Sequence, residues 1–160
     1  MVNIDFFWIG GTMATVAFDK EGRTALRESK FGHMTVGAIM EENVQSEGKD
    51  VKAEFVASLM MEGFGSVPIV DDADRLLGIV SEFDLLNAVR KGRKLADVTA
   101  GEIMTPNPVS VTKDTDVLMV IDVLHNNHLI RVPVIDSAGR LIGIVARRDV
   151  LRGYLQMSYM

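Results

Sequence analysis

Two aspartates stand at matching places in the chain and could bind a sugar. Asp84 and Asp149 each follow a short apolar run and fall in the first turn of a predicted helix. A carboxylate in that position can accept two hydrogen bonds from the 2′,3′-diol of a ribose. The alternative is a helix-start charge that interacts favourably with the helix dipole and binds no ligand. Because the aspartate recurs, we favour the ligand role, and the structural role stays open.

Groups that could bind a phosphate are distributed unequally. Phosphate is bound by helix-start amides, hydroxyls or arginine side chains. Ser81 precedes the first aspartate, with no cation between them, whereas Arg147 and Arg148 directly precede the second. Residues 35–98 carry seven Lys/Arg and 12 Asp/Glu, while residues 99–160 carry six of each. A phosphorylated ligand is therefore expected to prefer the second aspartate. Surface ion pairs of the two arginines are the alternative.

The composition excludes common kinds of active site. The chain has no Cys, which removes disulfides, thiolate zinc sites and cysteine nucleophiles. It contains no phosphate-binding loop, dinucleotide fingerprint, zinc-protease or serine-hydrolase motif. His125 and His128 are three residues apart, but without a third ligand we favour a role at a helix end over a metal site. We expect no enzyme activity, no metal and no required cofactor.

Charge and hydropathy argue against two kinds of partner. The net charge is −5 and no basic run is present, so nucleic-acid binding is not expected. The longest uncharged stretch, between Asp5 and Asp19, has 13 residues, whereas a bilayer span needs roughly 20. The residue ahead of it is acidic, unlike the start of a secretory signal. We expect a cytoplasmic protein without a membrane segment.

An internal repeat decides the architecture. Four pairs of segments correspond: 35–40 with 99–104, 67–71 with 132–136, 75–80 with 140–145, and Asp84 with Asp149. The offset is 64 residues in the first pair and 65 in the others, so one residue is inserted, which we place in a helix-to-strand turn. Two copies in the same order predict a duplicated fold of two units that bury their sheets against each other.

Each copy predicts the order strand, helix, strand, strand, helix, after a short helix capped by Thr. The helical spacing, the apolar runs and the turn residues between them set the bounds. For the two copies in turn, the expected elements are a short helix ending at Met40 or Met104, a strand near Val44 or at 109–111, a helix at 50–61 or 115–126, a hairpin at 67–70 with 76–80 or at 132–135 with 141–145, and a last helix starting near Glu82 or Arg147.

The first 33 residues lie outside the repeat. Residues 6–9 and 15–18 could form short strands, and residues 24–30 a helical turn. An aromatic arm of this kind is expected to pack on the repeats or on a partner, because exposing it would leave an adhesive patch. Gly32-His33-Met34 also resembles the remnant of a cloning site, so a natural start at Met34 is an alternative.

The repeated strings resemble the cystathionine-β-synthase (CBS) domain family. They are Val67-Pro68-Ile69-Val70 with Leu77-Gly78-Ile79-Val80, and Val132-Pro133-Val134-Ile135 with Ile142-Gly143-Ile144-Val145. The resemblance covers residues 34 to about 157 and implies an α/β (α+β) fold: a tandem CBS pair, or Bateman module. The expected segments are an extension at 1–33, a first motif at 34–94 and a second at 95–160, with 34–160 as one module.

The resemblance also implies site residues for adenosine ligands in clefts between the motifs. Ala146 departs from it, because the family has a hydroxyl there. The implied ribose and phosphate residues are Asp149, Arg148, Arg147 and Arg131 in one set, and Asp84 and Ser81 in the other. The implied adenine slots are formed by Val44, Ser66, Val67 and Pro68 beside Asp149, and by Val109, Ile130, Val132 and Pro133 beside Asp84. The alternative is that these apolar residues are simply core.

The function that the resemblance implies is regulatory. A stand-alone module would sense AMP, ADP, ATP or an S-adenosylmethionine-like nucleotide and act on an unknown effector protein. It would form a homodimer, since the last helices carry apolar faces that one chain cannot cover. Two alternatives remain: a structural dimerisation module with vestigial clefts, suggested by Ala146 and Glu82, and, least favoured, a small enzyme.

Overall fold

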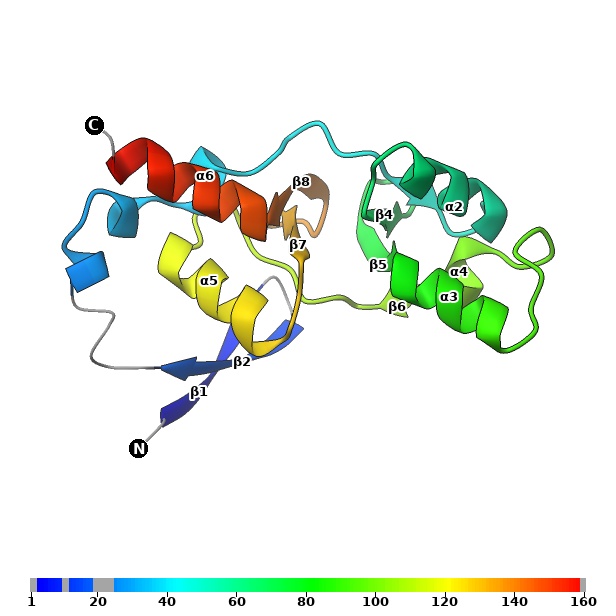
Figure 1. Cartoon of the computed structure of the whole chain (residues 1–160), viewed down its shortest axis with the longest axis horizontal. Helices are drawn as coiled ribbons and strands as arrows, with labels where there is room; N and C mark the ends of the chain where they lie inside the picture. Colours follow the sequence, from blue (N-terminus) through cyan, green and yellow to red (C-terminus); the bar gives the residue numbers. More distant parts are fainter. Residues whose placement is uncertain (1–2, 10–11, 19–24, 159–160) are drawn as a thin grey trace. The chain divides into compact units, whose positions relative to one another are not determined.

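The computed structural model describes residues 3–9, 12–18 and 25–158, and the side chains of residues 25–158 (Figure 1). The mixed α/β class is confirmed. Its elements are β1 (Asn3–Ile9), β2 (Thr12–Phe18), the 3₁₀ turns η1 (Phe31–His33) and η2 (Val36–Ala38), β3 (Glu47–Gly48), α2 (Ala53–Met61), β4 (Ser66–Val70), β5 (Leu76–Ser81), α3 (Glu82–Arg90), α4 (Ala100–Ile103), β6 (Thr105–Pro106), α5 (Val117–Asn126), β7 (Arg131–Ile135), β8 (Leu141–Ala146) and α6 (Arg147–Ser158).

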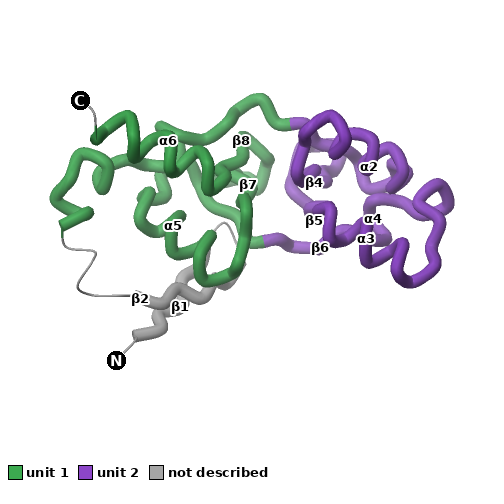
Figure 2. The backbone as a smooth tube through the Cα atoms, in the orientation of Figure 1, with its two compact units in different colours: residues 1–44, 109–160 green, residues 45–108 purple. Residues whose placement is uncertain are grey.

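The chain divides into two compact units that do not follow the sequence repeat (Figure 2). Unit 1 comprises Met1–Val44 and Val109–Met160, and unit 2 comprises Gln45–Pro108. The two boundaries are one repeat apart. Each unit therefore combines the hairpin and two long helices of one repeat with the leading segment of the other. The motif ranges proposed from the sequence, 34–94 and 95–160, group residues by sequence similarity, whereas the compact units group residues that pack together.

Unit 2 is built on a four-stranded sheet. The strand order is β3-β4-β5-β6, with β3 parallel to β4 and the other pairs antiparallel. The leading segment of the second repeat closes the unit, because the Ala100 amide donates to the Val51 carbonyl at 2.7 Å and the Gly101 amide to the Lys49 carbonyl at 2.8 Å. The buried core contains Ala53, Val56, Leu59, Met60, Val67, Ile69, Val80, Leu85, Val98 and Ala100.

Unit 1 repeats this plan around the antiparallel hairpin β7–β8. Single bridges stand where unit 2 has strands: Val111 pairs in parallel with Val134, and Glu41 pairs with Ile144. The leading segment of the first repeat packs here, as the Gly37 amide donates to the Lys113 carbonyl at 2.8 Å. The buried core contains Phe31, Val36, Ile39, Val111, Val117, Leu118, Val120, Val123, Leu124, Val132, Val134, Val145 and Val150.

A glycine in each hairpin lets the leading segment approach. A Cβ added to Gly78 would clash with the Met104 side chain and lie 2.9 Å from the Thr105 carbonyl oxygen. At Gly143 it would lie 2.9 Å from the Met40 sulfur and 3.0 Å from the Glu41 carbonyl oxygen. Side-chain bulk at these positions would separate the strands, which explains why the repeat has glycine at both.

Two expectations need correction, and one strand was missed. The strand expected near Val44 begins three residues later, at Glu47. The repeat's inserted residue lies in a helix, because α2 has nine residues and α5 has ten, while four residues follow each before the next strand. The strand β6 was not predicted, because a two-residue strand ending in Pro carries no alternating pattern.

The N-terminal segment forms the predicted strands. β1 and β2 pair antiparallel, with Asn3 opposite Phe18 and Ile9 opposite Thr12. Residues 25–27 are helical, and the helical turn expected at 24–30 is thus found within that range, Thr24 lying outside the described residues. Phe31 is buried in the core of unit 1, and a Cβ at Gly32 would clash with the Leu26 carbonyl. The residues just before Met34 are therefore part of the packed unit.

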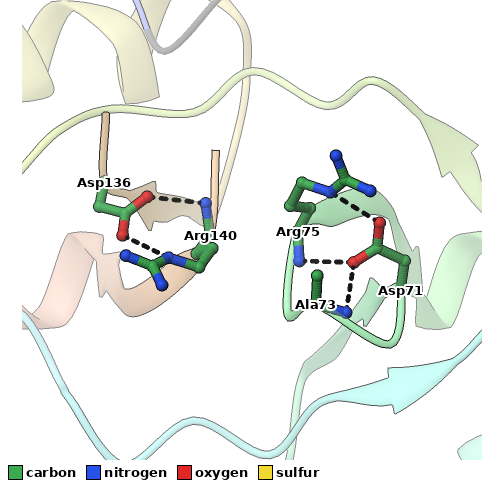
Figure 3. Close-up of polar contacts among 5 residues, drawn as sticks. All are labelled: Asp71, Ala73, Arg75, Asp136 and Arg140. Atoms are coloured by element: carbon green, nitrogen blue, oxygen red, sulfur yellow. Dashed lines mark hydrogen bonds and ion pairs between the residues drawn. The ribbon is translucent and has the colours of Figure 1, made fainter. Parts of the chain in front are cut away.

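Both hairpins turn around the same aspartate–arginine contact (Figure 3). Asp71 accepts hydrogen bonds from the amides of Ala73 and Arg75 and from the Arg75 Nε, each at 2.9 Å. Asp136 is bound in the same way by the amide and Nε of Arg140. The backbone hydrogen bond from the arginine is the largest cause that lowers the pKa of each aspartate below its ordinary value of 3.8.

These turns should make the free energy of unfolding depend on pH. A lowered pKa in the folded state stabilises the protein above about pH 3.8, and this contribution is lost as the pH falls through the folded pKa. Asp71→Asn should therefore lower the free energy of unfolding at pH 7, with the difference from wild type shrinking towards pH 3. Asp72→Asn, in the same turn but outside these contacts, is the control in urea titrations. A difference that persists unchanged at pH 3 would contradict this explanation.

Candidate functional site

The first predicted aspartate sits in a hydroxyl-rich corner of unit 2. Asp84 occupies the third position of α3, and its Oδ2 accepts hydrogen bonds from the Ser81 amide and hydroxyl, both at 2.7 Å. Its Oδ1 is 3.4 Å from the Thr105 hydroxyl. The Ser81 Oγ in turn accepts from the Asp84 amide at 3.3 Å, completing a capping box. One carboxylate oxygen thus fixes the helix start, and within residues 25–158 the other makes a single long contact.

Ser66, which the resemblance assigns to the slot beside Asp149, lies within unit 2 on the strand next to Ser81. It begins β4 and lies directly opposite Ser81, the last residue of β5. Ser66 is 8% exposed, and within the described residues its Oγ is buried without a hydrogen-bond partner. A buried hydroxyl without a partner is costly and is often satisfied by a bound molecule or water. The corner therefore combines one acid with the hydroxyls of Ser81 and Thr105, and the buried Ser66 hydroxyl lies on the neighbouring strand.

The second predicted aspartate has the same backbone position and different neighbours. Asp149 Oδ2 accepts from the Ala146 amide at 2.8 Å, and Oδ1 accepts from the Arg152 guanidinium at 2.7 Å. The residue is 8% exposed. Arg131 lies opposite Ala146, where unit 2 has Ser66 opposite Ser81. Cationic groups replace hydroxyls, so this corner suits a more negative ligand.

The two arginines before Asp149 are exposed, whereas Asp149 itself is buried. Arg147 begins α6, and its Nε donates to the Leu129 carbonyl at 2.6 Å. Both Arg147 and Arg148 are exposed, and neither forms an ion pair with another residue of the described range 25–158. The surface ion pairs weighed as the alternative are thus not found there.

The residues expected to line the adenine slots divide by burial. Val67 and Val132 have no exposed surface and belong to the unit cores, and Pro68 and Pro133 are also buried. Val44 and Val109 are half-buried and Ile130 is 63% exposed. Core packing, the alternative named for the whole set, describes Val67 and Val132.

Sequence reasoning missed two residues that contact the aspartates. Arg152 lies three residues after Asp149, one turn along α6, which is a spacing that predicts an ion pair. Thr105 reaches Asp84 only because β6 pairs with β5, and nothing local to Thr105 signals this contact. Glu41 is the unit 1 counterpart of Thr105, since it pairs with Ile144 as Thr105 pairs with Ile79.

The described residues hold neither a metal-ligand cluster nor a helix that could span a membrane. Residues 25–158 contain no group of three or more His, Asp or Glu that could hold a metal ion. None of the described helices combines the length and the apolar character that crossing a bilayer requires.

Comparison with known proteins identifies the family. The CBS domain model matches twice, at residues 36–91 and 100–156. An uncharacterised protein of Methanopyrus kandleri is 32% identical over 121 residues, which cover 74% of this chain and 62% of that protein. The chain thus spans less than two thirds of this relative. It spans about a fifth of the inosine-5′-monophosphate dehydrogenase of Thermoplasma acidophilum, and it also matches the CBS domain-containing protein CBSX1 of Arabidopsis thaliana.

Two solved structures carry ligands. The chain resembles CBSX2 of Arabidopsis thaliana in complex with AMP, with a TM-score of 0.72, 30% identity, and coverage of 78% of this chain and 98% of that one. It also resembles the CBS domain pair of protein MJ0100 in complex with 5′-methylthioadenosine and S-adenosylmethionine, with a TM-score of 0.69, 26% identity, and coverage of 77% and 97%. The chain belongs to the CBS domain family and carries two CBS domains in tandem.

Proposed function

We propose that the protein is a regulatory module that senses an adenosine-containing nucleotide. The observation that carries the proposal is the recurrent aspartate at the third position of the last helix in each unit. In both units one carboxylate oxygen binds the helix-start amide, and the other points to a polar neighbour, Thr105 or Arg152. The AMP and S-adenosylmethionine complexes of similar CBS pairs support adenosine as the shared part of the ligand.

The second carboxylate oxygen is the group that would read the ribose. In unit 2, the contact of Asp84 Oδ1 among the described side chains is the long one with Thr105, so a diol hydroxyl can donate to it without breaking a strong bond. In unit 1, Asp149 Oδ1 is held by Arg152, so a diol would share or displace that guanidinium. A freed Arg152 would join Arg131 in facing a phosphate. The unit 2 corner therefore suits adenosine or a low-charge derivative, and the unit 1 corner suits a phosphorylated one.

Binding of the nucleotide would regulate an effector protein without a chemical reaction. The protein requires no cofactor and is not an enzyme in this proposal; it changes its association with an effector protein because the ligand binds two arrangements of the chain with unequal affinity. The working form is a homodimer. Because adenine nucleotides are cellular metabolites, the cytoplasm is the proposed compartment.

A structural dimerisation module is the second candidate. The specific observation in its favour is that both aspartates already serve as helix caps, and that Asp149 has both oxygens occupied by Ala146 and Arg152. Those contacts explain the recurrence of the acid through helix formation alone. Distinguishing the two candidates requires a binding measurement.

Thermal unfolding with a panel of ligands separates the candidates. AMP, ADP, ATP, NAD and S-adenosylmethionine are each added to the protein at increasing concentration. A ligand at 100 times its Kd should stabilise the folded state by about 2.7 kcal/mol, so the Tm should rise with concentration. Inosine monophosphate, which shares ribose and phosphate with AMP, serves as a control for the base. Unchanged Tm with every nucleotide would favour the structural module, and turnover of any nucleotide would favour an enzyme.

A further inference from the structure

Unit 1 contains a cavity between its two long helices that the proposed function does not use. Helices α5 and α6 lie against each other in this unit (Figure 1), and the cavity between them has a volume of about 520 Å³. Pockets for small organic ligands have volumes of about 300–1,000 Å³. The lining comes from residues 121–128 and 147–151, all within unit 1. The cavity is therefore large enough for a small molecule and is formed by one unit.

The walls of the cavity are mostly apolar. Ile121 and Leu124 come from α5, and Val150 and Leu151 come from the start of α6. Leu124 is 3% exposed and Val150 is 6% exposed, and both belong to the buried core of unit 1, so packing fixes this part of the wall. Leu151 is 61% exposed, so the apolar surface extends to the solvent. An aromatic or branched hydrocarbon group would gain free energy by leaving water for such walls.

The polar side chains at the cavity are hydrogen-bond donors, and one of them is a permanent cation. They are His125, His128 and Arg147, and the described lining contains no carboxylate. An imidazole has an N–H group in its neutral form as well. The Arg147 Nε donates to the Leu129 carbonyl at 2.6 Å, which holds the guanidinium in place, and within residues 25–158 this guanidinium forms no ion pair. A negative group of a ligand would find a fixed partner here.

The corresponding helix start of unit 2 has the opposite charge. Glu82 begins α3 where Arg147 begins α6, and Leu86 corresponds to Leu151. The helix dipole favours an acid such as Glu82 in the first turn of a helix and disfavours a cation. The stability of α6 therefore does not explain Arg147, and the combination of apolar walls with a cation is a property of unit 1 alone among the two repeats.

We propose that this cavity is a second ligand site, which binds a monocarboxylate with a bulky apolar group. The hydrocarbon part packs against Ile121, Leu124 and Val150, and the carboxylate accepts hydrogen bonds from the guanidinium of Arg147. The planar guanidinium matches a carboxylate in charge and in geometry. Arylalkanoic acids and branched fatty acids are the chemical class. This site goes beyond the proposed function, because it gives unit 1 an input that contains no adenosine.

Titration of the full-length protein with 4-phenylbutyrate, followed by amide NMR signals, tests the site. 4-Phenylbutanol keeps the hydrocarbon without the charge, and butyrate keeps the charge without the ring. Phenylbutyrate should bind about tenfold or more tightly than either, because it makes both kinds of contact. The signals that move should be those of residues 121–128 and 147–151. Equal affinity for the alcohol, or shifts confined to other residues, would overturn the proposal.

Two substitutions test the cation and the location separately. Arg147→Gln should weaken phenylbutyrate binding about tenfold and change phenylbutanol binding by less than about twofold, because it removes only the charge. Leu151→Asp places a carboxylate at an exposed position of the lining and should weaken phenylbutyrate binding about tenfold or more. Leu86→Asp, at the corresponding exposed position of α3, is the matched control and should leave binding unchanged. Unaltered phenylbutyrate affinity in Arg147→Gln would contradict the assignment of the carboxylate partner.

Competition separates this site from the nucleotide corners and from a contact between copies. AMP should not compete with phenylbutyrate, and Asp149→Asn should leave phenylbutyrate binding unchanged. Competition by AMP would place the acid at a nucleotide corner, which would overturn the second site and leave nucleotide sensing intact. A chain that sediments as a dimer and does not bind phenylbutyrate would assign the cavity to the contact between copies, which would also overturn the site. Phenylbutyrate binding without any response to nucleotides would retain this site and remove the proposed function.

Discussion

A peptide of residues 45–108 should fold by itself, whereas a peptide of residues 34–97, equal in length and nearer to the sequence repeat, should not. The first contains all of compact unit 2. The second lacks Val98 and Ala100, which are buried in that unit's core, and it lacks β6. It instead carries residues 34–44, which belong to unit 1. Domains of about 60 residues are only marginally stable, so the loss of one packed segment is decisive.

The backbone contacts of the missing segment explain the size of the effect. The Ala53 amide donates to the Val98 carbonyl at 2.9 Å at the start of α2, and the Ala100 amide donates to the Val51 carbonyl at 2.7 Å. Without the segment, Gly78 and Ile79 of β5 also lose their β6 partners, Pro106 and Thr105. Several backbone groups of β5 and α2 would become unpaired together with the loss of core area.

Circular dichroism and urea titration distinguish the two peptides. Residues 45–108 should unfold in a cooperative transition, and residues 34–97 should show no transition. Ala100→Asp in the first peptide, which places a charge at a fully buried position, should abolish its transition and serves as the matched control. Cooperative unfolding of residues 34–97 would mean that the leading segment is dispensable and that the repeat is itself the folding unit.

Local signals were sufficient for the hairpins and the last helices. The apolar runs at 67–70 and 132–135, bounded by turns with Asp, extended to strands that begin one residue earlier, at Ser66 and Arg131. The last helices begin at Glu82 and Arg147 as predicted. Periodicity and turn chemistry act over a few residues, so they can be recognised in one sequence.

Each unit contains the leading segment of the other repeat, and the sequence similarity of the two repeats could not predict this arrangement. Residues 35–40 and 99–104 resemble each other, so each is compatible with either hairpin. Which hairpin receives which segment is decided by contacts between residues far apart in the chain, such as Met104 against Gly78 and Met40 against Gly143. A repeat shows that two segments are alike and gives no information about which copy each one packs on.

The candidate site was predictable in its acids and less so in their surroundings. The position of an aspartate in the first helical turn is a local feature, and Asp84 and Asp149 occupy it. The long contact from Thr105 depends on β6, a strand too short to recognise. Whether a valine in a hairpin faces the core depends on which sheet face is covered, and Val67 and Val132 proved fully buried.

Asp149→Asn should weaken ATP binding more than Asp84→Asn does. Asparagine retains an oxygen for the helix-start amides of Ala146 and Ser81, so both variants should keep their helix caps. Each loses a charged acceptor for a ribose hydroxyl, a hydrogen bond worth about 1.5–3 kcal/mol. This corresponds to roughly a tenfold to hundredfold loss of affinity at the affected corner.

The asymmetry should come from where the ligand binds, because cations accompany only one of the two aspartates. Arg131 and Arg152 belong to the unit 1 corner, where ATP should bind, and Ser66 and Thr105 belong to the unit 2 corner. The difference between the variants should therefore be largest for ATP and smallest for adenosine, which carries no phosphate. Isothermal titration calorimetry of both variants with both ligands gives the four affinities. Asp114→Asn, an exposed position in unit 1, controls for the change in net charge.

The ion pair between Asp149 and Arg152 allows variants to distinguish binding of the ribose from attraction of the phosphates. If Asp149 acts only as a helix cap that neutralises Arg152, then Asp149→Asn would release this cation and strengthen ATP binding, because the corner would gain one unpaired positive charge. If Asp149 binds the diol, the same variant weakens ATP and adenosine together, and Arg152→Ala weakens ATP alone. Tighter ATP binding by Asp149→Asn would therefore remove this aspartate from the ribose site, and equal losses in the two variants would contradict the placement of ATP beside Arg131.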